Sequence, residues 1–261
     1  MWSHRPSFTV TLLCASRIVH LYDRLFGRVG ALPAETPDLS VTHHSISSGK
    51  SVLDAVYVES RANPPRASVL ICHGIGETAP QWFPIQQILA ETGVSSLVFD
   101  YSSYGRSTGL PNWSQLELDA VSAFHLLERL APPGPISMLG FSLGTGIIPA
   151  ILNRVNAHRL VLCASFTSFR AAARAVGVPA FLSPLVPPIW DAKESLPGCR
   201  LPVLVVHSTT DGLFPVHMAH SVHSWCGGDA ELLLVPGLSH NEPFYRPQLS
   251  YWGPISDFLA T

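Results

Sequence analysis

The chain has 261 residues, of which 47% are hydrophobic and 13% are charged, so it is long enough for one large globular domain and too apolar for a disordered chain. Its formal net charge of −2 provides no broad basic surface, which argues against nucleic acid as a partner. None of its five cysteines has metal-ligand spacing. Cys72 and Cys163 lie in apolar, strand-like runs, so we interpret them as core thiols of a protein in a reducing, cytoplasmic compartment.

Residues 1–37 are predicted to form an amphipathic segment and a linker ahead of the domain. On a helix, residues 8–28 would carry a basic stripe beside apolar side chains. Arg17 and His20 interrupt the apolar run before it could span a bilayer. Three interpretations stay open: a helix on the protein's own body, peripheral membrane contact through residues 8–28, and a cleaved signal peptide. Two glycines and two prolines in residues 27–37 indicate the linker.

From residue 38 onward, strand-like and helix-like patterns alternate. Residues 41–47 and 52–58 flank a Ser-Gly-Lys turn, which favours a hairpin at a sheet edge. The segments that follow are predicted as a strand at 68–72, a helix at 80–92, a strand at 95–99, a helix at 114–130, a strand at 136–139, a helix after residue 142, a strand at 159–163, a strand at 202–207, a helix at 216–225, a strand at 231–235 and a helix at 248–259. This order predicts one α/β domain over residues 38–261, with a mainly parallel sheet covered by helices on both faces. Pro149 predicts a kink or an early end in the helix after residue 142.

Residues 164–200 interrupt the alternation with five prolines and a series of large apolar side chains. We expect this insert to form a small apolar cap over Ser142. Phe181, Leu185 and Trp190 are the candidates in it for contact with a substrate. The alternative is a surface helix and loop that only complete the core.

The sequence Gly140-Phe141-Ser142-Leu143-Gly144 fits the G-x-S-x-G pattern, in which a serine sits on a sharp turn between a strand and a helix. The turn brings neighbouring backbones close, so the positions two residues before and after the serine must lack a side chain. Because an apolar strand-like run precedes Ser142 and helical spacing follows it, the serine is predicted to be a catalytic nucleophile.

A serine hydroxyl needs a base, and the base needs a carboxylate that holds its tautomer. In a hydrolase built on this sheet both partners follow the serine in the chain. His240 lies in a loop just after a predicted strand and is the candidate base. Asp211 follows the preceding strand directly and is the candidate acid, whereas Asp191 lies in the insert and Asp229 precedes its strand.

Attack of the serine on a carbonyl group makes the carbonyl oxygen negative. The site therefore also needs N–H donors that stabilise this oxygen. We predict the N–H of Leu143, at the start of a helix, and that of Ile75, in the loop His73-Gly74-Ile75-Gly76-Glu77 after a strand. We interpret His73 as a structural residue and Glu77 as a solvated loop carboxylate.

Several ordered motifs carry a family resemblance from about residue 52 to the end of the chain. They are His73-Gly74, the turn Asp100 to Ser107, Gly140 to Gly144, Phe166-Thr167-Ser168-Phe169, Asp211 and Ser239-His240-Asn241. In these the chain resembles the α/β-hydrolases, in particular the short-capped group of Bem46-like proteins and abhydrolase-17-type depalmitoylases. The resemblance implies the α/β-hydrolase fold and a serine hydrolase of acyl esters, thioesters or amides, with no metal or organic cofactor.

The chain departs from the family at two positions. It has Ile75 where the family commonly has Asn, and His207-Ser208 where the family commonly has His-Gly.

From the motifs and the resemblance together, we predict a serine hydrolase that cleaves an acyl ester or thioester of a hydrophobic small-molecule or acylated substrate. The alternatives are a peptidase or amidase of the same fold, and a non-catalytic membrane-associated or binding protein.

Overall fold

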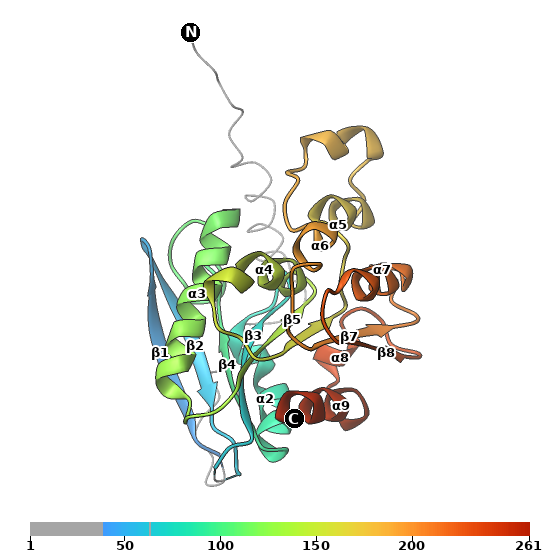
Figure 1. Cartoon of the computed structure of the whole chain (residues 1–261). Coiled ribbons are helices and arrows are strands. Elements are labelled where there is room, and N and C mark those ends of the chain that lie inside the picture. Colours follow the sequence, from blue (N-terminus) through green and yellow to red (C-terminus); the bar gives the residue numbers. More distant parts are fainter. Residues whose placement is uncertain (1–38, 63) are drawn as a thin grey trace.

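A computed structural model describes residues 39–62 and 64–261, so the predictions for residues 1–37 lie outside the described residues. Its centre is an eight-stranded sheet in the order β1-β2-β4-β3-β5-β6-β7-β8 (Figure 1). The strands are β1 (Val41–Ser48), β2 (Ser51–Val58), β3 (Ala67–Cys72), β4 (Val94–Phe99), β5 (Ile136–Phe141), β6 (Leu160–Cys163), β7 (Val203–Ser208) and β8 (Ala230–Val235). The β1–β2 hairpin pairs antiparallel at one edge, and β3 to β8 run parallel. This confirms the predicted fold class.

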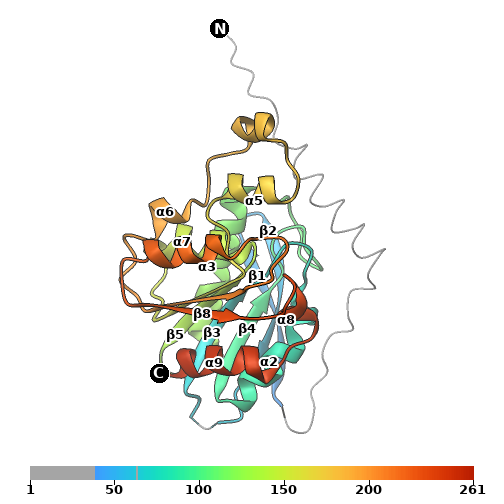
Figure 2. The same cartoon turned by 90° about the vertical axis from the view of Figure 1, so that its right-hand side faces the viewer.

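Helices cover both faces of the sheet, as Figure 2 shows from the side. The longer ones are α2 (Phe83–Glu91), α3 (Trp113–Leu130), α4 (Gly144–Ile151), α7 (His217–Trp225) and α9 (Leu249–Ala260). Apolar side chains of α3, α4 and α7 pack on one face, and those of α2 and α9 pack on the other. Successive residues of β3 alternate between the two clusters, since Leu70 belongs to the first and Ile71 to the second. Within the described residues no helix has the length and apolarity needed to cross a bilayer.

Pro149 ends α4 early, as the sequence predicted. The α-helix stops at Ile151, two residues beyond the proline, and continues as the 3₁₀ turn η2 (Leu152–Arg154). Proline lacks the N–H that an interior helix position donates, so the helical ladder is already broken there.

The insert between β6 and β7 contains α5 (Phe169–Ala175), the 3₁₀ turn η3 (Ala180–Leu185) and α6 (Ala192–Ser195). Its two ends are tied together, because the N–H of Phe169 donates to Ile189 O at 3.3 Å. Trp190 packs edge-on against Trp113 and Phe169, with ring centroids 5.3 and 5.5 Å away. These contacts anchor the base of the insert on the start of α3.

Candidate active site

Parallel strands bring three distant segments to one edge of the sheet. Strand β5 ends just before Ser142, β7 ends three residues before Asp211, and β8 ends five residues before His240. Because these strands point the same way, the loops after them leave from the same edge. The order of the chain alone therefore directs the three side chains toward each other.

Ser142 sits on the sharp turn that the G-x-S-x-G pattern predicts. Its φ of 49° lies in the left-handed region that non-glycine residues rarely adopt. A Cβ at Gly140 would approach the carbonyl carbon of Gly144 to 2.7 Å, and one at Gly144 would approach Cys72 O to 1.9 Å. Only glycine fits either position, so the two glycines permit the strained backbone that presents the hydroxyl.

The structure joins Ser142, His240 and Asp211 in one chain of hydrogen bonds. His240 Nδ1 lies 2.7 Å from Asp211 Oδ2, and His240 Nε2 lies 3.0 Å from Ser142 Oγ. An ionised carboxylate only accepts, so Nδ1 carries the hydrogen, and in the neutral ring Nε2 then accepts the hydrogen bond from the serine hydroxyl. All three residues are at least nine-tenths buried. The arrangement can move a proton from the serine to the imidazole.

Asp211 is equipped to stay charged despite its burial. Burial by itself raises the pKa of this carboxyl group, but the hydrogen bond and charge of His240 lower it, as do the N–H groups of Leu213 and Phe214. Each of these two N–H groups donates to Oδ1 at 2.8 Å. The net effect holds the pKa of Asp211 below its ordinary value, so the group is a carboxylate at neutral pH.

The departure at His207-Ser208 has a structural explanation that the sequence did not reveal. Ser208 Oγ donates to Leu238 O at 2.5 Å, and Thr210 Oγ1 donates to the same oxygen at 3.0 Å. These bonds tie the loop of Asp211 to the loop of His240. The ring of His207 donates through Nε2 to Phe214 O at 2.8 Å. Burial lowers the pKa of His207, so this ring is neutral at neutral pH.

The two N–H groups predicted as oxyanion donors belong to Ile75 and Leu143. Leu143 immediately precedes α4, where helix geometry leaves N–H groups without an acceptor. Its side chain is buried, whereas that of Ile75 is half exposed. Among the described residues, backbone hydrogen bonds involve the neighbouring Glu77 and Thr145 but neither of these two N–H groups. Their role as oxyanion donors stays a prediction.

The loop after β3 closes on a buried carboxyl group. Glu77 is only 4% exposed, so its prediction as a solvated residue was wrong. Its Oε2 accepts hydrogen bonds from Gly74 N–H at 2.7 Å and from Trp82 Nε1–H at 3.0 Å. A Cβ at Gly74 would come within 2.6 Å of Glu77 Oε1, so glycine permits this closure. Burial raises the pKa of Glu77 to about 8 against the effect of both hydrogen bonds, and the group carries a proton at neutral pH.

Trp82 connects this carboxyl group to the nucleophile turn. Its buried ring lies edge-on to that of Phe141, the residue before Ser142, with centroids 5.7 Å apart. A loop glutamate has the same sequence pattern whether it turns outward or inward. The indole N–H of Trp82, five residues later, was the one signal that could have indicated a buried partner for Glu77.

The three residues predicted to contact substrate have different surroundings. Phe181 and Leu185 are 79% and 75% exposed on η3, the outermost turn of the insert. Trp190 is buried at the base of the insert, and its Nε1–H donates to Glu117 Oε1 at 3.0 Å. These contacts give Trp190 a packing role, and contact of the three residues with a substrate stays a prediction.

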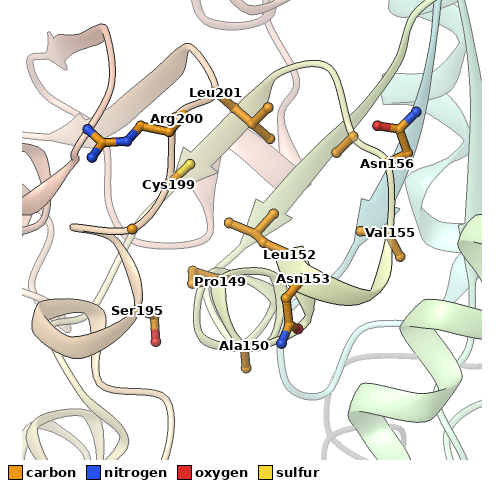
Figure 3. A pocket seen from close by; sticks show the side chains of 12 residues that line it. Pro149, Ala150, Leu152, Asn153, Val155, Asn156, Ser195, Cys199, Arg200 and Leu201 are labelled. Atoms are coloured by element: carbon orange, nitrogen blue, oxygen red, sulfur yellow. The ribbon is translucent and has the colours of Figure 1, made fainter.

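A pocket of about 570 Å³ lies at the opposite edge of the sheet, where α4 ends and β7 begins (Figure 3). Its lining includes Pro149 and Asn153 on one side and Cys199 and Arg200 on the other. Because α4 runs back from the turn of Ser142 to this pocket, the pocket is remote from the hydrogen-bonded site. In the described part of the chain, no group of three His, Cys, Asp or Glu side chains could hold a metal ion.

Comparison with known proteins identifies the family of the chain. A family model described as serine aminopeptidase, S33, matches residues 63–193, half of the chain. The chain belongs to this α/β-hydrolase family. The alpha/beta hydrolase domain-containing protein aho-3 of Caenorhabditis elegans is 32% identical over 146 residues, which cover 55% of this chain and 43% of that protein. Lysophosphatidylserine lipase ABHD12 of Mus musculus is 23% identical over 226 residues, covering 77% of this chain and 56% of the relative.

The matched region of this α/β-hydrolase thus spans about half the length of these two relatives. Among solved structures, the Pyrococcus furiosus esterase Pf2001 superimposes with a TM-score of 0.70 at 18% identity, covering 88% of this chain and 97% of the esterase. An esterase from an Arctic intertidal metagenomic library superimposes with a TM-score of 0.65 at 17% identity, covering 87% and 95% of the two chains. At such identities the likeness establishes the shared fold.

Proposed function

We propose that this α/β-hydrolase cleaves an acyl ester or thioester of a hydrophobic substrate through Ser142, His240 and Asp211. The observation that carries the proposal is the unbroken hydrogen-bond chain from Asp211 through the imidazole to the serine hydroxyl. The strained backbone at Ser142 supports it, because strained residues cluster at active sites.

In the proposed reaction, Ser142 Oγ attacks the substrate's carbonyl carbon while His240 Nε2 takes the hydroxyl proton. The carbonyl oxygen becomes negative and accepts hydrogen bonds from the N–H groups of Ile75 and Leu143. The C–O or C–S bond then breaks, and His240 gives its proton to the leaving group. Water, deprotonated by His240, attacks the acyl-serine, and the acid product leaves as Ser142 regains its proton. Asp211 stabilises the imidazolium in both steps.

Substrate class is proposed from the surroundings of the site. The insert beside the sheet edge is apolar, and the names of the mouse relative and of the Pyrococcus structure describe a lipase and an esterase. Both features favour an ester or thioester with an apolar acyl chain. We propose the exposed Phe181 and Leu185 as its contacts at the insert, with Trp190 supporting them by its packing at the base.

Labelling with a fluorophosphonate, which reacts with activated serines, tests the proposal. We expect the wild type to be labelled, Ser142→Ala to be unlabelled, and His240→Ala to react slower by roughly 10³-fold or more. His73→Asn is the matched control, because His73 is also buried at this edge but directs its Nδ1 hydrogen bond to Gly74 O rather than to Ser142. Its rate should stay within about tenfold of the wild type. A folded wild type that is not labelled would contradict the proposal and favour a non-catalytic binding protein.

Amide or peptide cleavage is the second candidate, because the family model is described as a serine aminopeptidase. Aryl esters, thioesters and amides with matched acyl chains separate the two candidates. The proposal requires a higher kcat/KM for the esters or thioesters, with kcat/KM rising with the length of the acyl chain. A preference for amides with a free amino terminus would assign the peptidase activity instead.

A further inference from the structure

The insert carries an exposed apolar turn, which we call the docking tip and define as residues 176–189. It contains no charged residue. Val176, Phe181 and Leu185 are 64%, 79% and 75% exposed, and no residue of η3 is buried. Single exposed hydrophobic side chains are common on protein surfaces. A group of them on one uncharged segment indicates a surface that binds an apolar partner.

The docking tip projects from the domain on an anchored base. Figures 1 and 2 both show η3 standing clear of the sheet and of the helices that cover it. At the base, Arg170 Nε donates to Val186 O at 2.8 Å, and the aromatic contacts of Trp190 fix the return of the chain. A projecting turn of this kind can insert into the surface of a lipid layer while the rest of the domain stays outside that layer.

Further apolar side chains are exposed at the same edge of the sheet. Ile75 and Leu110 are 50% and 83% exposed, in the loops after β3 and β4. These strands run parallel to β6, whose end leads into the insert, so their loops and the insert leave from one edge. Ser142 lies at that edge too. A layer that receives the docking tip would therefore face the proposed reaction site.

The charges on α5, at the start of the docking tip, favour an anionic layer. Arg170 and Arg174 on α5 are the only charged residues between positions 164 and 190. They precede the uncharged turn, whereas Glu117 and Asp191 lie where the chain returns, so the cationic side of the base is α5. Anionic lipid headgroups above a hydrocarbon layer complement that order of charge and apolarity.

The backbone of the docking tip is also suited to an apolar layer. Residues 179, 184, 187 and 188 are prolines, which have no N–H. A backbone donor that enters lipid without a partner is costly, and each proline removes one such donor.

We propose that the docking tip, with Arg170 and Arg174, binds the surface of a lipid bilayer that contains anionic lipid, with Phe181 and Leu185 at the headgroup–hydrocarbon boundary. A second copy of the chain fits this surface less well, because a stable protein interface needs roughly 800 Å² on each partner and a narrow turn offers little area. Binding requires no catalysis, so the inference stands apart from the proposed reaction.

Co-sedimentation of the full chain with vesicles tests the proposal. We expect the wild type to bind vesicles of phosphatidylcholine with phosphatidylserine, and the double variant Phe181→Asp/Leu185→Asp to show a partition coefficient lower by at least about tenfold. Leu249→Asp is the matched control, since Leu249 is 63% exposed on α9, away from the insert. Its partition coefficient should change by less than about twofold. Circular dichroism verifies that each variant is folded.

Charge reversal tests the cationic base separately. Arg174→Glu should lower binding to the anionic vesicles by about fivefold and leave binding to pure phosphatidylcholine unchanged. Arg154→Glu is its control, because Arg154 is exposed in η2 at the other edge of the sheet. Equal losses for the two variants would contradict a role for the base of the insert.

Two outcomes would overturn the proposal. One is wild-type partitioning of the double variant. The other is a wild type that does not bind vesicles but forms a concentration-dependent dimer in analytical ultracentrifugation. If the double variant does not form this dimer, the docking tip binds a second copy of the chain. Ser142→Ala should bind vesicles as the wild type does, so failure of the proposed reaction and failure of docking remain distinguishable.

Discussion

Two buried histidine–aspartate pairs with different carboxyl groups lie at the same edge of the sheet, and their geometries differ. His240 Nδ1 is 2.7 Å from Asp211 Oδ2, a short hydrogen bond. His73 Nε2 is 3.8 Å from Asp100 Oδ1, which is too far for a hydrogen bond. Among the described residues, this Nε2 atom has no other hydrogen-bond partner. The first pair continues to the hydroxyl of Ser142, whereas the second ends inside the core.

The pKa values of the two aspartates also differ: that of Asp100 is raised and that of Asp211 is lowered. Burial raises the pKa of Asp100 to about 7 and lowers that of His73 to about 4, so at neutral pH His73 is uncharged and Asp100 is partly protonated. Asp211 has a lowered pKa although it is buried as well. Burial therefore does not by itself determine which carboxyl group keeps its charge.

Deeper burial and the nearby charge of Asp54 raise the pKa of Asp100, and the hydrogen-bond donors of the two carboxyl groups add to the difference. Asp211 accepts two backbone N–H groups at 2.8 Å in addition to the imidazole. Asp100 accepts one backbone N–H at 2.7 Å, from Ala79, and a longer one at 3.3 Å, from Arg106. Donors that converge on an ionised group stabilise it against desolvation. Charge is thus concentrated at the pair that could use it for proton transfer.

The largest expected effect comes from neutralising each aspartate in turn. Asp211→Asn should slow fluorophosphonate labelling by about 10³- to 10⁴-fold, because the amide stabilises neither the imidazolium nor the tautomer that accepts from Ser142. Asp100→Asn should stay within about tenfold of the wild type, since Asp100 bonds only loop N–H groups. Rates are measured by gel after timed labelling. Equal losses in the two variants would remove the distinction between the pairs.

Glu77 provides a second, smaller test at the His73 side of the edge. Glu77→Ala should lower the free energy of unfolding by about 1–3 kcal/mol, because it leaves the N–H groups of Gly74 and Trp82 buried without an acceptor. Glu77→Gln keeps an acceptor oxygen and should recover most of this loss. Urea unfolding measures both. A loss in the glutamine variant as large as that in the alanine variant would show that the two hydrogen bonds are unimportant.

A further test concerns how pH changes that stability. Folding raises the pKa of Glu77 from its ordinary 4.5 to about 8, so the folded state binds more protons than the unfolded state between these values. Its contribution is therefore fully present below about pH 4.5 and is lost as pH rises through about 8. Glu77→Gln lacks this contribution.

The stability of Glu77→Gln relative to the wild type should consequently improve as pH rises from 5 to 8. Other titrating groups, including Asp100, are present in both proteins and cancel in the difference. Urea unfolding at a series of pH values measures it. A difference independent of pH would mean that Glu77 ionises at its ordinary pKa in the folded protein.

The local pattern of the sequence determined the order and type of the elements. Apolar runs marked the strands to within two residues, and Pro149 marked the early end of α4. These features depend on neighbours in the chain, so a local pattern contains them. The same pattern indicated that Ser142, Asp211 and His240 follow strands of one parallel sheet, and the structure brings the three together.

Only the tertiary structure decided how polar and apolar side chains are used away from those positions. Glu77 turns inward because Trp82 supplies a donor from the next helical turn, and Ser208 ties two loops because Leu238 supplies an acceptor 30 residues away. Phe181 and Trp190, both aromatic and both in the insert, end at opposite extremes of exposure. Burial depends on which distant groups arrive beside a residue, and the local sequence does not contain that information.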